Sequence, residues 1–230
     1  MRGIALAQSS LHSICGGCKN LAYNGESHIL IYMVNTVGSL TEFERSIIIG
    51  SVLGDGYMRI MPGRSNAFLE INHSIKAREY VDYKYKSLEK ICESAPKERA
   101  TNEGRIAYRF FTKQHKELTE IYNQFYKNNK KIIPKDLILN PVVLAVWYMD
   151  DGSKCRDHDI YLNTQQFSIN DQKILLFKLR SIGIEARLNK DKKYHRIRIL
   201  KTSIKKFMDI ITPHIFKSMQ YKLVKLVMTP

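Results

Sequence analysis

The chain has 230 residues, and its 37 Lys and Arg exceed its 22 Asp and Glu, which gives a formal net charge of +15. With 44% hydrophobic and 26% charged residues it has the composition of a folded globular protein, and no apolar run approaches the roughly 18 residues of a membrane span. Four scattered cysteines, Cys15, Cys18, Cys92 and Cys155, are too few for a disulfide scaffold, so we expect reduced thiols in an intracellular protein, within an organelle or a bacterial or archaeal cytoplasm.

The charge surplus favours a polyanionic partner, nucleic acid before an acidic membrane surface, over a protein that is merely soluble and basic. It is concentrated in residues 181–230, which hold 12 Lys and Arg against 3 Asp and Glu. There, Arg196 and Arg198 alternate with Ile197 and Ile199. This period of two predicts a strand that buries its isoleucines and presents its guanidinium groups to a nucleic acid.

Residues 1–40 carry few charges and no sustained helical or strand period. Cys15 and Cys18 have the spacing of a metal knuckle or a redox pair, but no second Cys/His pair follows to complete a zinc site. We interpret this segment as a loosely ordered leader that contains a chance pair of cysteines.

Two start signals locate the helices that matter most for function. Thr41 and Glu44 form a capping box, which predicts a helix that ends near Gly54. Asn140 followed by Pro141 predicts a second helix that runs to residue 150. Hydrophobic periodicity and turn residues predict the other elements. They are strands 67–74 and 105–112 with helices 75–92 and 113–127 after the first helix, and strands 160–167, 185–190 and 194–200 with helices 170–182 and 202–214 after the second.

The second series of elements repeats the first, and its landmarks keep their spacing. Asp55 and Asp151 are 96 residues apart, and Lys131 and Lys222 are 91 residues apart. Two copies of one unit predict a pseudo-twofold molecule, which suits the near-twofold symmetry of duplex DNA. We expect a leader over residues 1–40, a first repeat over 41–138 and a second repeat over 139–230.

Both of these helices are almost uncharged until an Asp-Gly pair, Asp55-Gly56 in one and Asp151-Gly152 in the other. Because the C-terminal end of a helix carries about half a negative charge, a carboxylate there is repelled. If the helices pack side by side, both carboxylates converge with the terminal carbonyls. That arrangement gives hard oxygen ligands suited to Mg²⁺.

The two nine-residue stretches 48–56 and 144–152 resemble the motif of the LAGLIDADG homing endonucleases. The chain is similar to the single-chain, two-repeat type, to which intron-encoded enzymes of yeast mitochondria belong. The resemblance covers residues 41–226 and includes the stretches 128–134, 147–152, 162–165 and 220–223. It implies an α+β fold of two αββαββα repeats, whose motif helices form the central interface and whose antiparallel sheets form a DNA-binding saddle.

The resemblance also implies the roles of individual residues. The metal ligands would be Asp55 and Asp151, with the backbone carbonyls of Gly54 and Asp150. The basic active-site residues would be Lys131 and Lys222. The polar residues near the reacting water would be His73 and Gln165. The cofactor would be Mg²⁺, with Mn²⁺ able to substitute. One departure concerns helix packing, because Val146 stands where the motif usually has glycine.

DNA recognition is expected on the outer faces of the sheets, where Arg, Asn and Gln can read base edges and lysines can bind phosphates. The candidates are Glu70, Asn72, Arg105, Arg109, Asn163, Gln165, Arg187, Asn189, Lys192, Lys193, Arg196 and Arg198.

The main hypothesis is a monomeric site-specific endonuclease that cleaves double-stranded DNA with divalent metal ions. One alternative is an RNA maturase that assists splicing of its host intron, and the two activities could coexist. Another is a DNA-binding protein that has lost cleavage. Retention of both motif aspartates and both lysines argues against that loss. No Gly-rich phosphate loop is present, which argues against nucleotide hydrolysis.

Overall fold

The computed structural model describes residues 39–100, 104–155 and 159–224. The chain divides into two units, Met1–Tyr32 and Met33–Pro230, and all described residues belong to the second. Most of the leader that the sequence predicts, with Cys15 and Cys18, lies outside the described residues. Within those residues, no helix has both the length and the apolarity that crossing a membrane requires.

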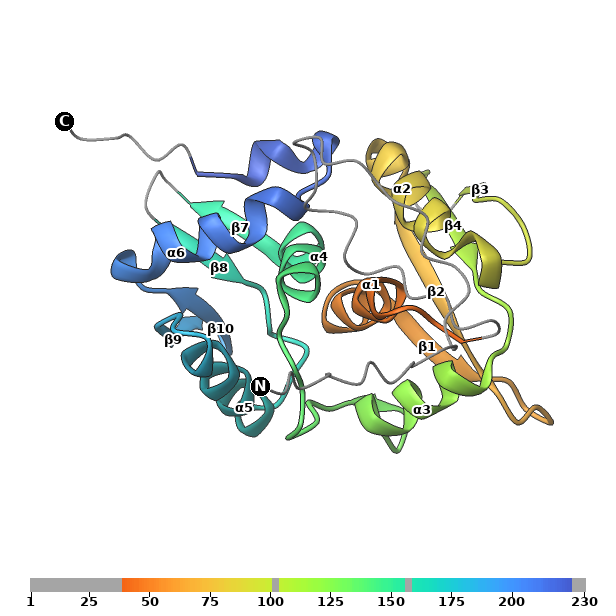
Figure 1. The fold of residues 1–230 in the computed structure, drawn as a ribbon, viewed down its shortest axis with the longest axis horizontal. Coiled ribbons are helices and arrows are strands. Elements are labelled where there is room, and N and C mark those ends of the chain that lie inside the picture. Colours follow the sequence, from red (N-terminus) through yellow and green to blue (C-terminus); the bar gives the residue numbers. More distant parts are fainter. Residues whose placement is uncertain (1–38, 101–103, 156–158, 225–230) are drawn as a thin grey trace, which may run out of the picture. The chain divides into compact units, whose positions relative to one another are not determined.

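Two αββαββα repeats account for most of the described residues (Figure 1). The first consists of α1 (Glu42–Leu53), β1 (Tyr57–Ile60), β2 (Ala67–Ser74), α2 (Arg78–Leu88), β3 (Lys97–Ala100), β4 (Ile106–Phe111) and α3 (Lys116–Phe125). The second consists of α4 (Pro141–Asp151), β7 (Gly152–Cys155), β8 (Asp159–Leu162), α5 (Ile169–Ser181), β9 (Ala186–Asp191), β10 (Tyr194–Ile199) and α6 (Lys201–Ile211).

Shorter elements complete the described part of the chain. A hairpin of β5 (Tyr126–Lys127) and β6 (Lys130–Lys131) follows the first repeat. The 3₁₀ helices are η2 (Ile75–Ala77), η3 (Glu89–Ile91), η4 (Thr212–His214) and η5 (Lys217–Lys222).

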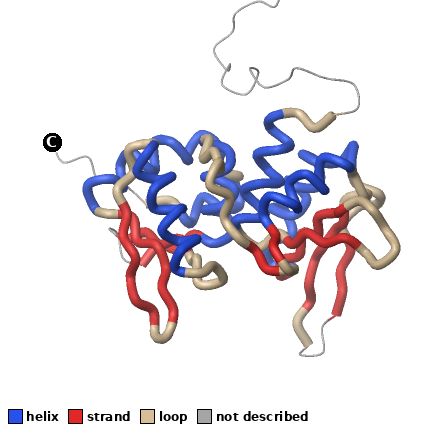
Figure 2. The backbone as a smooth tube through the Cα atoms, turned by 90° about the horizontal axis from the view of Figure 1, so that it is seen from below, coloured by secondary structure: helices blue, strands red, loops and turns tan. Residues whose placement is uncertain are grey.

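Each repeat forms a four-stranded antiparallel sheet, with strand order β1-β2-β4-β3 in the first and β7-β8-β10-β9 in the second. The two orders are equivalent, which confirms the repeat that the sequence predicts. Figure 2 shows the strands of both sheets on one side, with most of the helices packed on the other. Apolar side chains such as Leu69, Ile71, Ile197 and Ile199 are buried, because they point from the sheets toward the helices. The opposite face of each sheet is left for polar residues.

The two central helices begin at the predicted caps. The Thr41 side chain accepts a hydrogen bond from the Glu44 N–H at 3.2 Å, and the Glu44 carboxylate accepts one from the Thr41 N–H at 2.7 Å. At α4, the Asn140 side chain accepts from the Val143 N–H at 2.9 Å, and Pro141 takes the first helical position. Both predicted helix starts are confirmed, and the caps fix where the two helices enter the core.

Helices α1 and α4 pack against each other at the centre of Figure 1, and the contact is asymmetric. A Cβ placed on Gly50 would lie 2.7 Å from the Val146 Cβ, and one placed on Gly54 would lie 2.4 Å from the Asp150 Cβ. Each close approach therefore pairs a glycine of α1 with a larger residue of α4. Bulk at Val146 does not separate the helices, because Gly50 opposite leaves the space that it fills.

The sequence analysis missed three short strands of the two sheets and the small β5–β6 hairpin, and it made one strand too long. β1 and β7 have only four residues each, and β3 is exposed along its whole length, so these strands carry little hydrophobic alternation. The predicted strand 160–167 ends at Leu162, because the chain then turns. In that turn the Thr164 hydroxyl bonds the Gln172 side chain at 3.1 Å, and the Phe167 N–H bonds the Thr164 carbonyl at 3.0 Å.

Candidate active site

The two motif aspartates lie at the C-terminal ends of the packed helices, as predicted. Asp55 follows α1 and keeps 47% of its side chain exposed, whereas Asp151 is the last residue of α4 and is partly buried. Both line a groove of about 1230 Å³, together with Lys131, Gln165 and Gln166. The helix pair thus brings together two carboxylates that are 96 residues apart in the sequence.

Both predicted lysines reach the carbonyls at these helix ends. Lys131, from β6, donates from Nζ to the Gly54 carbonyl at 2.8 Å. Lys222, from η5, donates to the Asp150 carbonyl at 3.2 Å and to the Met149 carbonyl at 2.5 Å. The geometry is pseudo-symmetric, because each ammonium sits at the negative end of its own repeat's helix.

Both lysines are partly withdrawn from water. Burial lowers the pKa of Lys131 to about 8, although the neighbouring Asp151, Asp150 and Asp55 carboxylates oppose the shift. Burial also lowers the pKa of Lys222 below its usual value. With a pKa of about 8, Lys131 is mostly a cation at pH 7, and in its poorly solvated place on the groove its electric field is strong.

Asp151 lies close to two other carboxylates, those of Asp55 and Asp150, so negative charge is in excess around it. Burial raises its pKa to about 7, and the Asp55 and Asp150 carboxylates contribute to the rise. The amide nitrogen of Gln166 donates to the Asp151 carboxylate at 3.2 Å, and the two lysines partly oppose the shift. A divalent cation fits such a donor set, because carboxylates and backbone carbonyls are hard oxygen ligands in need of positive charge.

Gln166 lies beside Asp151, a contact that the sequence analysis did not predict. Its side-chain amide reaches Asp151 and also lies 3.4 Å from the Gly54 carbonyl. Gln165 instead donates to the Asp191 carboxylate at 3.0 Å. Gln165, which the resemblance placed near the reacting water, also lines the groove, and both glutamines lie in the turn that follows the end of β8 at Leu162.

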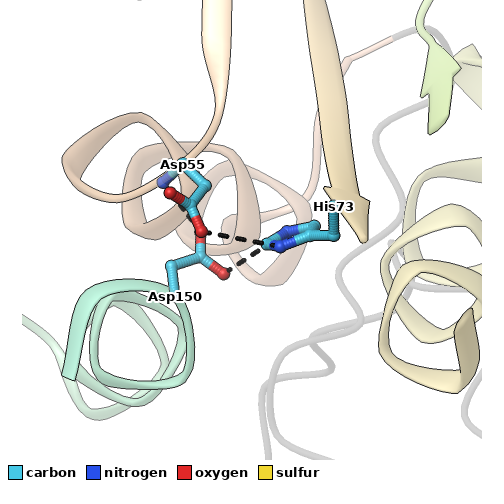
Figure 3. Close-up of side chains that lie close together, drawn as sticks. All are labelled: Asp55, His73 and Asp150. Atoms are coloured by element: carbon cyan, nitrogen blue, oxygen red, sulfur yellow. Dashed lines mark hydrogen bonds and ion pairs between the residues drawn. The ribbon is translucent and has the colours of Figure 1, made fainter. Parts of the chain in front are cut away.

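His73 lies on β2 and faces the helices, near both Asp55 and Asp150 (Figure 3). Its Nδ1 is 3.5 Å from the Asp55 carboxylate, and its Nε2 is 3.8 Å from that of Asp150. Burial lowers the pKa of His73, and the nearby Lys84 ammonium adds to this effect. The imidazole is therefore neutral near pH 7, so these contacts are not ion pairs.

The carboxyl oxygens of Asp55 and Asp150 and a ring nitrogen of His73 lie within 4.8 Å of one another, close enough to hold an ion. However, the Asp150 carboxylate is fully buried and already paired with the Lys84 ammonium, at 2.7 and 2.8 Å from its two oxygens. A cation placed there would face that ammonium. We therefore do not assign the Asp150 side chain to a metal, in line with the sequence prediction that only its carbonyl contributes.

The predicted DNA-binding residues of the first repeat lie on the outer face of its sheet. Asn72 is directly opposite Arg109 in the pairing of β2 with β4. Glu70 shares this face and lies 3.4 Å from Arg109 and 3.7 Å from Arg59, so its charge is largely neutralised. Arg105 precedes β4 rather than belonging to it.

The second sheet presents a more basic face. Arg196 pairs with Asn189 and Arg198 with Arg187 across β9 and β10, so these four side chains share one face, as predicted. The Arg196 guanidinium stacks 4.0 Å from the centre of the Tyr161 ring, and Arg198 forms an ion pair with Asp159. The exposed Lys192 and Lys193 form the tip of this hairpin, and Asn163 lines the groove.

Comparison with known proteins identifies several similar sequences. The model of the LAGLIDADG DNA endonuclease family matches residues 45–207. The chain is 29% identical to "Probable intron-encoded endonuclease 1" of Wickerhamomyces canadensis, over 80% of this chain and 85% of that protein. It is 30% identical to "Cytochrome b mRNA maturase bI2" of Saccharomyces cerevisiae, over 83% of this chain and 49% of that protein.

A solved structure supports the same grouping. "The homing endonuclease I-WcaI bound to its DNA recognition sequence" matches with a TM-score of 0.75 and 27% identity, over 82% of this chain and 89% of that one.

Proposed function

The chain belongs to the LAGLIDADG DNA endonuclease family, and from this premise we propose that it is a site-specific homing endonuclease that hydrolyses both strands of duplex DNA with divalent metal ions. One observation carries the proposal. Asp55 and Asp151 end two packed helices at one groove, each beside a lysine, between two sheets with polar outer faces. A single chain holds both repeats, for which we propose the bounds 41–138 and 139–230, and we propose that it acts as a monomer on one target.

The proposed metal ligands are the side chains of Asp55 and Asp151 with the carbonyls of Gly54 and Asp150. In the metal-free geometry, the ammonium groups of Lys131 and Lys222 lie on these carbonyls. The carbonyl oxygens proposed to bind the metal ion therefore already interact with positively charged groups. We propose Mg²⁺ as the ion, with Mn²⁺ able to substitute, because both favour oxygen ligands.

Phosphodiester hydrolysis requires an activated water in line with the leaving oxygen, and neutralisation of the negative charge that grows on the phosphate. Bound divalent ions supply water activation and charge neutralisation. Lys131, on the groove wall, and Lys222, at the end of α4, stabilise the developing charge, and low hydration strengthens their effect. Gln166 holds the Asp151 carboxylate by a hydrogen bond, while His73, as a neutral imidazole, can accept or donate a hydrogen bond to water near Asp55.

The outer sheet faces are proposed to read the target. Arg196, Arg198, Arg187 and Asn189 supply the donors and acceptors that recognise base edges in the major groove. The tip lysines, Lys192 and Lys193, supply phosphate contacts.

The direct test is to incubate the protein with a random duplex DNA library in Mg²⁺ and to sequence the cut ends. A homing endonuclease is expected to yield one long recognition sequence with cuts at a fixed position on each strand. Cuts without a shared sequence would contradict site specificity. Selective binding without any cut in Mg²⁺ or Mn²⁺ would identify a DNA-binding protein that has lost cleavage.

DNA affinity is expected to fall steeply with salt, because phosphates are neutralised by lysine and arginine and counterions are released. If about six phosphates are contacted, log Kd should rise with log salt with a slope of about 5. Replacing Lys192 and Lys193 with alanine should lower this slope by about 1 to 2, whereas Lys205→Ala, on the helix side, should leave it unchanged. Fluorescence anisotropy from 50 to 300 mM KCl measures the slope. A flat dependence would contradict the proposed DNA surface.

The similarity to the yeast maturase favours one second candidate, assistance in splicing a host intron. Host intron RNA would then be a second partner. The test is whether the protein accelerates splicing of its own intron in vitro, with the cleavage-dead variant described below as the control. Splicing by that variant would separate the two activities.

A further inference from the structure

Asp150 has an unusual environment for a carboxylate. Its side chain and that of Lys84 are both fully buried, and the Lys84 Nζ lies 2.7 and 2.8 Å from the two Asp150 oxygens. The Tyr80 hydroxyl donates to one oxygen at 2.8 Å. The other oxygen accepts the backbone N–H of Asp55 at 3.3 Å. The carboxylate therefore links α2 to the residue that follows α1.

Stability alone does not explain this pair. Burial of two charges costs desolvation energy, and apolar residues of similar shape often replace a buried ion pair without loss of stability. Asp150 also lies near the C-terminal end of its helix, beside Asp55 and Asp151, where another negative charge is disfavoured. The Asp150 carboxylate is therefore expected to have a role other than stabilising the fold.

The location of the carboxylate indicates that role. The Asp150 Cβ packs against Gly54, at the closest approach of α1 and α4. The next residue, Asp55, turns out of the helix, and its N–H bonds the Asp150 side chain rather than a carbonyl of its own helix. Lys84 and Tyr80 hold the carboxylate from α2 of the first repeat, so its position does not depend on α4 alone.

Among the residues that the structure describes, only one of the two motif aspartates, Asp55, is held in this way. Gly54 stands at the position in the first motif that corresponds to Asp150, so no carboxylate lies under the second motif aspartate. Asp151 is held instead by Gln166 at its side chain, and its carbonyl accepts the Asn163 N–H at 2.9 Å. Different contacts therefore hold the two aspartates, the Asp150 carboxylate at Asp55 and the Gln166 amide at Asp151.

We propose that Lys84 and Tyr80 are positioning residues for the reaction, which fix the Asp150 carboxylate so that it holds the Asp55 backbone and orients the Asp55 side chain into the groove. This inference rests on the proposed function, because the orientation of Asp55 matters for cleavage only if Asp55 binds a catalytic metal ion. Neither residue touches the DNA or the reacting atoms. Their effect on cleavage passes through Asp150 and Asp55.

The test uses the double variant K84M/D150L, which replaces the ion pair with apolar side chains of similar shape. We expect its melting temperature and its DNA affinity in Ca²⁺ to stay close to those of the wild type. We expect kcat in Mg²⁺ to fall about 10- to 100-fold, as when an outer-shell partner of a metal ligand is lost. In metal-free protein, the Asp55 amide should exchange its hydrogen faster by NMR.

A second variant keeps the test informative if the double variant fails to fold. Y80F removes one hydrogen bond to Asp150 and keeps the ring, which packs edge-on against His73. It should fold, bind DNA normally and show a smaller loss of kcat together with faster exchange at Asp55. The control is K205M, which breaks the exposed Lys205–Asp209 pair on α6 and should change none of these quantities.

Wild-type kcat and wild-type exchange at Asp55 in a folded K84M/D150L or Y80F protein would overturn the proposal, because the pair would then be structural only. Failure of the proposed function gives a different result. In that case the wild type itself would cut no DNA, while the exchange measurement would still report whether Asp150 holds Asp55.

Discussion

The double variant Asp55→Asn with Asp151→Asn is expected to bind target DNA like the wild type and to cleave it at least about a thousandfold more slowly. A catalytic metal stabilises the transition state by several kcal/mol. Because each 1.4 kcal/mol lost lowers the rate about tenfold, loss of the metal ligands should produce a fall of this size. Asparagine keeps the shape of the side chain and removes its charge. The proposed DNA contacts lie on the sheet faces, and the two changes lie at the helix ends. Affinity is measured in Ca²⁺ or without metal, and cleavage in Mg²⁺.

The single variants are expected to differ, because the two aspartates are held differently. Asp55→Asn or Asp151→Asn can leave one strand cut, so the products must be separated on a denaturing gel with each strand labelled. Asp209→Asn, on the exposed side of α6, is the matched control and should cleave normally. Full cleavage by the double variant would refute the assignment of the two carboxylates.

Asp150→Asn tests the register of the second motif. The resemblance gives a ligand role to the Asp150 carbonyl and none to its side chain, so on that ground alone the variant should cleave almost normally. The structure changes this expectation, since the variant leaves the buried Lys84 ammonium without its counter-charge and replaces the carboxylate that we propose to hold the Asp55 backbone. The variant is therefore expected to show a partial loss of kcat together with a loss of stability. Its cleavage must therefore be compared at equal amounts of folded protein. An inactive Asp150→Asn beside an active Asp151→Asn would mean that the motif had been read one residue out of register.

Long elements with a clear hydrophobic period could be predicted from the sequence, and short or polar ones could not. The caps at Thr41 and Asn140 are local signals, and both helix starts were found. β3 has no buried residue, so no pattern marks it. Its place in the sheet depends on its pairing with β4, which is a tertiary contact that no local pattern contains.

The same distinction holds for the candidate site. Asp55, Asp151, Lys131 and Lys222 follow from the repeat and its resemblance, because each has a counterpart in the other half. Lys84 has no such signal, since a lysine on an amphipathic helix is usually solvated. Only the contact of α2 with the end of α4 reveals that it is buried.

The metal-free Asp151→Asn variant is expected to be more stable than the wild type, by an amount that depends on pH. Burial and the neighbouring carboxylates raise the pKa of Asp151 to about 7, from the value of about 3.8 that a solvated aspartate has in the unfolded chain. Between these two values the folded wild type binds a proton that the unfolded chain has lost. The free energy of unfolding of the wild type therefore falls as pH rises from about 4 to about 7, and the penalty is complete above pH 7.

Asparagine removes this penalty, so the gain in stability should be absent near pH 4 and full at pH 8. Three pKa units correspond to about 4 kcal/mol, but Lys131 and Lys222 lose a counter-charge in the variant, which reduces the expected gain to about 2 kcal/mol or roughly 4–8 °C in melting temperature. Thermal unfolding in EDTA from pH 4 to 8 measures the difference in melting temperature between the variant and the wild type. For the control Asp209→Asn, this difference should not change with pH. A variant that is less stable than the wild type at pH 8 would contradict the charge excess at this site.

Addition of Mg²⁺ in place of EDTA should narrow the stability difference between the Asp151→Asn variant and the wild type. The ion needs the ionised Asp151 carboxylate, so it binds and stabilises the folded wild type alone and offsets the repulsion between the carboxylates.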